Sequence, residues 1–160
     1  MKARGMVGLV VAVLIPLLVG ALGSVATSSA IPSWYQRLEK PSWNPPNWLF
    51  GPAWTVLYVL MGVASWLVWR SDRKRGVVRV GLGLYGFQLA LNLLWTVIFF
   101  GWRKPGAAFV EIFVLAGAIV ATMTMFFRVK PIAGWLLVPY LLWVSFASTL
   151  NGAIWQLNRE

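Results

Sequence analysis

Long apolar runs separated by short polar and charged connections are the dominant pattern of this chain. A helix that crosses a bilayer needs about 20 mostly apolar residues. Five runs meet that requirement, at residues 6–29, 47–69, 79–101, 106–127 and 133–156. Because these runs take up most of the 160 residues, we predict an all-α fold with a single domain, residues 1–160, that forms an integral membrane bundle of five transmembrane helices.

The composition also indicates a multi-pass membrane protein. The chain is 59% hydrophobic and 11% charged, whereas charged residues make up roughly 25% of a soluble domain. The net charge of +10 comes from short clusters of Lys and Arg between the apolar runs, without the interleaved aromatic residues of a nucleic-acid-binding stripe. We therefore expect contacts with membrane lipids and no nucleic-acid partner.

The first apolar run has features of a signal peptide. Lys2 and Arg4 precede it and a Ser-Ser-Ala sequence follows it. Its apolar core, residues 6–23, is longer than the signal h-region, which has about 7 to 15 residues. We therefore expect a retained first helix.

Basic residues are distributed unevenly over the connections. The N-terminus and the connections at 70–79 and 128–130 fall on one side and carry nine Lys or Arg, whereas the other side carries five. In a bacterial inner membrane, the positive-inside rule places the first side in the cytoplasm. Outer membranes use different insertion machinery, so inner and outer membrane both remain open.

The residue types that are missing limit the chemistry. The chain contains no Cys and no His, and these residues supply most transition-metal ligands and the commonest general base. We therefore expect no metal site and no cofactor.

One apparent motif is set aside. Residues 81–86 read GLGLYG and fit the G-x-G-x-x-G fingerprint of dinucleotide sites, which requires a preceding strand. Here the motif lies inside a predicted span. Its glycines instead suggest close helix packing, with Gly86 and Ala90 as one small-residue pair and Gly117 and Ala121 as another.

Helical spacing selects one mixed stripe on each of three runs, because residues i, i+4, i+7 and i+11 share a face. The stripes are Trp54, Tyr58, Met61 and Ser65; Gln88, Asn92, Trp95 and Phe99; and Trp143, Ala147, Leu150 and Ile154. Each stripe combines aromatic surface with polar or small residues. Such faces would suit a flat and mostly apolar ligand.

The polar residues of the third run allow two interpretations. Gln88 and Asn92 must find hydrogen-bond partners in the hydrocarbon region, either on neighbouring helices or on a ligand. Glu111 is the one acidic residue inside a predicted span, which makes it a candidate functional group. Its shallow position favours a structural role, in which it reaches the membrane interface or pairs with Lys104 or Arg103.

Three blocks of the sequence resemble one known family. They are WYQRLEKPSWNPP at 34–46, GLYGFQLALNLLW at 83–95 and VPYLLWVSFASTLN at 138–151. These blocks resemble the tryptophan-rich sensory protein/translocator protein (TspO/MBR) family, also called peripheral-type benzodiazepine receptors. The resemblance implies a five-helix bundle, often a homodimer, that binds porphyrins such as protoporphyrin IX, with cholesterol and drugs as further ligands in animal members.

The resemblance and the stripes together define a candidate site. The expected ligand-binding residues are Trp54, Tyr58, Gln88, Asn92, Trp95, Trp143, Ala147 and Leu150. All except Tyr58 and Gln88, which come from helical spacing alone, match the family's pocket. In that picture the Pro-rich loop of Trp43, Asn44, Pro45 and Pro46 forms a stiff lid, and the alternative is an ordered loop that caps the second helix.

The sequence departs from the animal family in its sterol motif. That motif needs a Tyr between Leu150 and a basic residue, and none occurs before Arg159, so we expect no strong sterol preference. A reverse-order sterol pattern runs through Arg79, Tyr85 and Leu89.

Two further departures concern the dimer and the ligand. The animal GxxxG dimer element would need Gly at 87, where Phe87 stands, so a homodimer would use Gly86 and Ala90 or another face. Without His, a haem would lack its usual axial ligand. A metal-free porphyrin is therefore the better candidate.

Three functions remain open from the sequence. The leading one is a receptor or binding protein for porphyrins that acts in tetrapyrrole sensing, trafficking or regulation. Some family members promote light-dependent porphyrin breakdown, which would make the protein an enzyme with Trp54 and Trp143 as its redox-active residues. The third is a transporter or a binder of sterols and other lipids, although we find no inverted repeat of the kind many transporters have.

Overall fold

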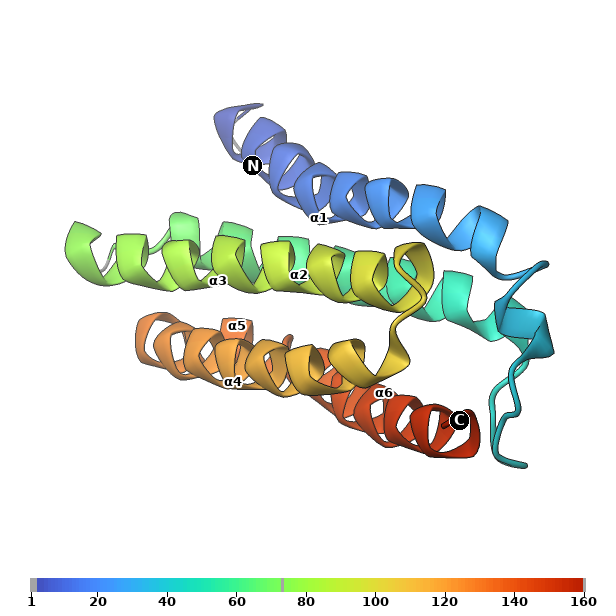
Figure 1. The fold of residues 1–160 in the computed structure, drawn as a ribbon. Coiled ribbons are helices and arrows are strands. Elements are labelled where there is room, and N and C mark those ends of the chain that lie inside the picture. Colours follow the sequence, from blue (N-terminus) through green and yellow to red (C-terminus); the bar gives the residue numbers. More distant parts are fainter. Residues whose placement is uncertain (1–2, 73, 160) are drawn as a thin grey trace.

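The computed structural model describes residues 3–72 and 74–159, which form long helices joined by short connections (Figure 1). The elements in chain order are α1 (Ala3–Ala30), η1 (Tyr35–Arg37), α2 (Asn47–Trp69), α3 (Arg75–Thr96), η2 (Val97–Gly101), α4 (Pro105–Val129), α5 (Pro131–Trp135) and α6 (Val138–Leu157). Within this described part of the chain, five stretches are long and apolar enough to cross a membrane, with α3 and η2 forming one and α5 and α6 another. The predicted all-α architecture with five spans is confirmed.

Prolines mark several helix boundaries. Pro105 and Pro131 occupy the first turns of α4 and α5, where a missing N–H costs no helical hydrogen bond. The fifth span is interrupted between α5 and α6, which the single predicted run at 133–156 did not anticipate. Pro139 explains the interruption, because it has no N–H for the carbonyl of Trp135 and its ring crowds that carbonyl.

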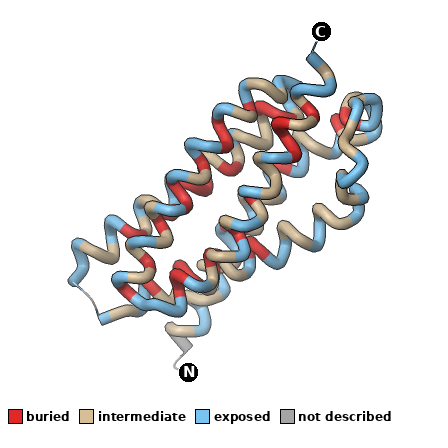
Figure 2. The backbone as a smooth tube through the Cα atoms, turned by 90° about the horizontal axis from the view of Figure 1, so that it is seen from below, coloured by how far each residue is buried: buried red, intermediate tan, exposed pale blue. Residues whose placement is uncertain are grey.

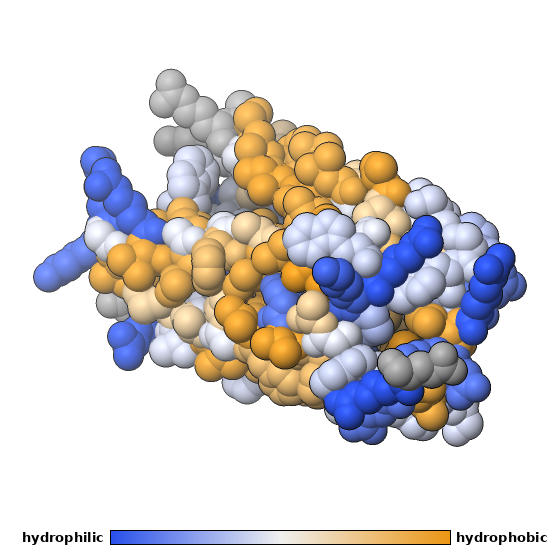
Figure 3. Space-filling view, viewed as in Figure 1, coloured by the Kyte–Doolittle hydropathy of each residue, from blue (hydrophilic) through white to orange (hydrophobic). Residues whose placement is uncertain are grey.

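The helices pack around α4, and α1 lies at the edge of the bundle. α4 packs against α3 and α6, and α1 packs mainly against α2. Buried segments face the bundle interior in Figure 2, and α1 is the least buried of the five spans. Figure 3 shows apolar surface along α1, whereas the most hydrophilic side chains gather mainly at the two ends of the molecule. This distribution is typical of a multi-pass integral membrane protein.

Close helix packing occurs at different glycines from those that the sequence suggested. A Cβ on Gly62 would lie 2.5 Å from Cα of Val13, so α1 and α2 meet backbone to backbone there. A Cβ on Gly86 or Gly117 would meet nothing within 4 Å. The prediction that Gly86 and Gly117 mediate close packing is therefore wrong within this chain, because both lie on outward-facing sides of their helices.

Glu111 also differs from its prediction. It is 9% exposed, and both carboxylate oxygens are buried without a hydrogen-bond partner among the described residues. No ion pair joins it to Lys104 or Arg103, so the expected pairing is wrong. Glu111 lies on the α4 face that packs into the bundle, about two turns along the helix from Lys104, which is exposed at the helix end.

Candidate functional site

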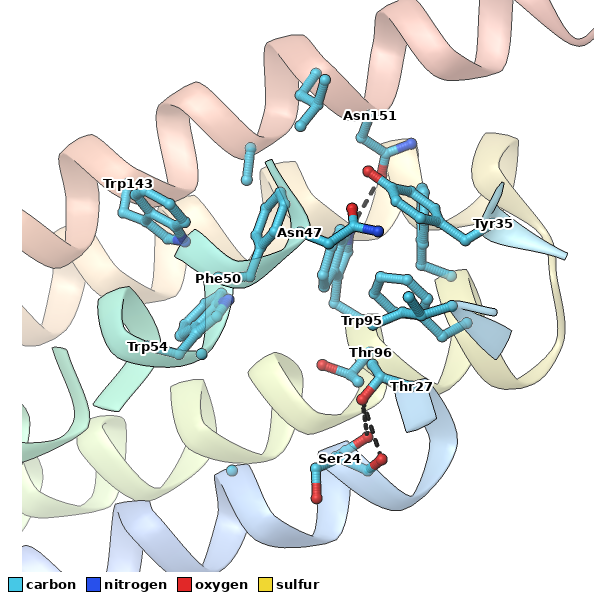
Figure 4. Close-up of a pocket in the computed structure, with 18 of the residues that line it drawn as sticks. Ser24, Thr27, Tyr35, Asn47, Phe50, Trp54, Trp95, Thr96, Trp143 and Asn151 are labelled. Carbon is cyan, nitrogen blue, oxygen red and sulfur yellow. Dashed lines mark hydrogen bonds between the residues drawn. The ribbon is translucent and has the colours of Figure 1, made fainter. Parts of the chain in front are cut away.

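A pocket of about 530 Å³ lies at the end of the bundle where α1 ends and α2 begins. Residues from α1, α2, the end of α3 with η2, and α6 form its walls (Figure 4). Its lining is mainly aromatic and aliphatic, with a few hydroxyl and carboxamide groups. The connection between α1 and α2 contributes Ile31 and Tyr35 at this end.

Trp54 on α2 is the centre of an aromatic cluster on one wall. Its ring stacks on Tyr58, with centroids 5.4 Å apart, and meets the edge of Trp143 on α6 at 6.4 Å and 83°. Phe50 lies one turn before Trp54, and its ring meets that of Trp143 edge-on, with the two centroids 6.0 Å apart. Two helices thus present four aromatic rings to the same space, and Phe50, Trp54 and Trp143 are labelled in Figure 4.

Trp95 on α3 forms the facing wall. Its ring stacks on Phe99, with centroids 5.2 Å apart and an angle of 22°. Its indole N–H donates to Oδ1 of Asn151 on α6 at 3.1 Å, and Asn151 Nδ2 donates to the carbonyl of Pro105 at 2.8 Å. Asn151 therefore holds α3, α6 and the start of α4 together beside the pocket.

Gln88 and Asn92 lie behind this aromatic surface and do not line the pocket. Tyr58 donates its hydroxyl to Oδ1 of Asn92 at 2.8 Å, and Asn92 Nδ2 donates to the hydroxyl of Tyr140 at 3.2 Å. Tyr140 in turn donates to Oε1 of Gln88 at 2.8 Å. In the structure both carboxamides take part in interhelical hydrogen bonds, and Asn92 fixes the position of Tyr58, which does line the pocket.

The Pro-rich loop lies beside the pocket end, and its residues 43–46 are not part of the lining. Trp43 packs edge-on against Phe146 of α6 at 5.9 Å. Asn44 Oδ1 accepts a hydrogen bond of 3.1 Å from the hydroxyl of Tyr35, a lining residue. The loop is thus attached both to α6 and to the pocket wall.

Lys40 brings a positive charge close to the pocket end. Its Nζ lies 4.8 Å from the centroid of the Tyr35 ring and donates to the carbonyl of Leu38 at 2.9 Å. Burial lowers the pKa of the Lys40 ammonium and raises the pKa of the Tyr35 hydroxyl. Among the described residues no cluster of acidic side chains could hold a metal ion.

Sequence reasoning found part of this lining. Six predicted residues line the pocket: Trp54, Tyr58, Trp95, Trp143, Ala147 and Leu150. It missed the wall that α1 supplies, made of Gly20, Gly23, Ser24 and Thr27. These four follow the spacing i, i+3, i+4 and i+7, so they share one helix face. Their small size and regular spacing were the available signal, but neither property distinguishes a pocket wall from a packed interface.

Five spanning helices, four of which line an aromatic pocket, define an integral membrane protein with a receptor-like architecture. The chain belongs to the TspO/MBR family, whose model matches residues 12–156. It is 50% identical to the tryptophan-rich protein TspO of Chlorobaculum tepidum over 142 residues, and this aligned stretch covers 89% of this chain and 90% of that protein.

Other relatives come from animals and further bacteria. The chain is 47% identical over 128 residues to the human translocator protein, with 78% of this chain and 75% of that protein covered. It is 40% identical over 141 residues to the tryptophan-rich sensory protein of Cereibacter sphaeroides, with 86% and 87% covered.

Proposed function

We propose that the pocket binds a porphyrin-like tetrapyrrole and that the protein acts in tetrapyrrole sensing, trafficking or regulation. The observation that carries this proposal is the convergence of Trp54, Trp95 and Trp143 from three helices on one apolar space. The pocket volume of about 530 Å³ falls within the range of about 300 to 1,000 Å³ that is common for small-molecule sites. A tetrapyrrole is flat and largely apolar, so it could stack on or meet the edges of these rings.

The pocket end would receive the polar edge of such a ligand. Protoporphyrin IX carries its carboxylates on one edge, and Lys40 supplies a positive charge next to Tyr35. The loop residues Trp43, Asn44, Pro45 and Pro46 would act as a lid over this end. Gln88 and Asn92 would act on binding through the position of Tyr58 rather than by touching the ligand.

The test is a titration of the detergent-purified protein with protoporphyrin IX in the dark, followed by the absorbance of the porphyrin. Trp54→Leu and Trp143→Leu should each weaken binding roughly tenfold, because each removes an aromatic contact of about 0.5 to 1.5 kcal/mol in addition to buried area. Trp135→Leu is the matched control, since Trp135 is exposed on α5 and does not line the pocket. Saturable binding that neither pocket substitution weakens would contradict the proposed site.

One contact favours light-dependent porphyrin degradation as a second candidate function. The rings of Trp54 and Trp143 lie 6.4 Å apart, and both line the pocket. A bound porphyrin would therefore absorb light next to two oxidisable indoles, with dioxygen as the oxidant of the porphyrin.

Illumination in air separates this activity from binding alone. A degrading protein should yield a new absorbing product, and Trp143→Phe should reduce the yield while it retains an aromatic ring for binding. Bleaching at the same rate with and without protein would reject the enzymatic function and leave the binding proposal intact.

A further inference from the structure

A second hollow lies on the other half of the bundle, toward the N-terminal end of α1. This α1–α3 groove has a volume of about 880 Å³ and shares no lining residue with the tryptophan pocket. Its walls include Val11 and Ile15 from α1, Trp66 and Trp69 from α2, and Leu82 and Gly86 from α3. The groove follows one side of α1, which is inclined to α2 and α3 in Figure 1.

Gly86 leaves the α3 side of the groove open. A Cβ at this position would meet no atom within 4 Å, although Gly86 lines the groove. Gly83 is also open in this sense, but it lies on another side of α3 and does not line the groove. A large side chain at Gly86 would therefore fill the groove, whereas the same side chain at Gly83 would not, so the two positions form a matched pair for substitution.

Positive charge gathers at one end of the groove. Cζ of Arg70 lies 4.7 Å from the ring centroid of Trp66, which lines the groove. Arg79 precedes Leu82 by three positions and Gly86 by seven on α3, so it continues the same helix face beyond the apolar wall. The groove thus combines an apolar length with the Arg70 guanidinium beside one end, and Arg79 lies on the α3 face that leads to this end.

We propose that the α1–α3 groove is a binding site for one anionic phospholipid, with an acyl chain along the apolar wall and the phosphate between Arg70 and Arg79. Basic groups beside a crevice between spanning helices are suited to anionic headgroups. The apolar lining is suited to an acyl chain, which makes no hydrogen bonds.

Two other occupants fit the groove less well. A sterol would use the reverse-order pattern through Tyr85, but the Tyr85 hydroxyl is buried below the surface and offers the ligand no polar contact. A second copy of the chain, inserted in parallel, would bring its own Arg70 and Arg79 to the same membrane face. The positive charges of the two copies would repel one another around the groove, whereas the negative charge of an anionic lipid would attract Arg70 and Arg79.

Native mass spectrometry of the detergent-purified protein tests the proposal. Palmitoyl-oleoyl phosphatidylglycerol and phosphatidylcholine, which carry the same chains, are compared as bound lipids. We expect one retained phosphatidylglycerol at concentrations where phosphatidylcholine is not retained. Arg70→Gln should weaken retention about fivefold, because one basic residue near an anionic lipid is worth about 1 kcal/mol.

Filling the groove tests the acyl-chain position independently of charge. Gly86→Leu should reduce phosphatidylglycerol retention roughly tenfold, since it displaces one or two methylene contacts of about 0.8 kcal/mol each. Gly83→Leu should leave retention unchanged, and thermal unfolding of both variants in detergent shows that they are folded.

Several results would overturn the proposal. These are equal retention of the two lipids, equal losses in Gly83→Leu and Gly86→Leu, or displacement of phosphatidylglycerol by cholesterol. A Gly86→Leu variant that retains the lipid but changes from dimer to monomer would assign the groove to a second copy.

Discussion

The hydroxyl of Tyr140 on α6 donates a hydrogen bond of 2.8 Å to Oε1 of Gln88 on α3. Tyr140 is 1% exposed, as is Gln88, so this bond forms in the centre of the bundle, away from water. The same hydroxyl accepts from Asn92, whose Oδ1 accepts from Tyr58. A chain of polar groups thus connects the deepest part of the core to the wall of the tryptophan pocket.

This chain should show a measurable coupling between Gln88 and Tyr140. Gln88→Leu removes the acceptor and leaves a buried hydroxyl with one partner fewer, at a cost of about 1 kcal/mol. Double-mutant cycles, which compare two single variants with the double variant, assign an average of about 0.6 kcal/mol to an interhelical hydrogen bond in a membrane protein. The free energy of unfolding in mixed micelles should therefore fall less in the double variant Gln88→Leu/Tyr140→Phe than the two single losses predict. Strictly additive losses would show that the bond contributes nothing.

Substitution of Gly62 should separate α1 from α2. A Cβ at this position would lie 2.5 Å from Cα of Val13 and 2.7 Å from the carbonyl oxygen of Ala12, and backbone atoms cannot move aside as a side chain can. We expect Gly62→Ala to lower the free energy of unfolding by about 1 to 3 kcal/mol.

Gly83→Ala is the control for that measurement. Gly83 lies on α3 with open space around it, so an added methyl group should stabilise the helix by up to about 1 kcal/mol. A Gly62→Ala variant as stable as Gly83→Ala would mean that α1 can move away from α2 at little cost.

Lys40 should distinguish a charged porphyrin from an uncharged one. Lys40→Gln should weaken the binding of protoporphyrin IX about two- to fivefold, as for a partly exposed ion pair, and leave the binding of its dimethyl ester unchanged. Lys130→Gln is the control, because Lys130 follows α4 at the opposite end of the bundle. Equal effects on the acid and the ester would contradict a role for this charge.

The charge of Lys40 should also make the preference for protoporphyrin IX over its dimethyl ester depend on pH. Lys40 carries its charge below its pKa, and burial lowers that pKa. The preference for the dicarboxylic porphyrin over the ester should therefore be present near neutral pH and be lost as the pH rises, at a lower pH than for an unperturbed lysine. A preference that persists unchanged to strongly alkaline pH would exclude Lys40 as its source.

Replacement of Glu111 should stabilise the protein. Its carboxylate is buried without a hydrogen-bond partner among residues 3–72 and 74–159, which is costly for any polar group in an apolar environment. We expect thermal stability in detergent to increase from wild type to Glu111→Gln and further to Glu111→Leu, which buries no polar atom. Loss of stability in both variants would indicate that the carboxylate makes a contact on which the fold depends.

The sequence by itself determined the spans and three of the pocket walls. Hydrophobic length fixes the spans, because each must cross the same hydrocarbon thickness. Helical spacing then places Trp143 with Ala147 and Leu150 on one face, and all three line the pocket. These are local properties, and neither depends on which helix lies next to which.

The tertiary structure decided everything that depends on neighbours. Only packing shows that Asn92 bonds to Tyr140 rather than lining the pocket, that Asn151 holds Trp95, and that Glu111 is buried with no hydrogen-bond partner in the described part of the chain. The sequence alone likewise did not predict that α1 lines the pocket or that a groove lies between α1 and α3. A glycine in a spanning helix can mark a close contact, as at Gly62, or open space, as at Gly86, and the difference lies in where the next helix runs.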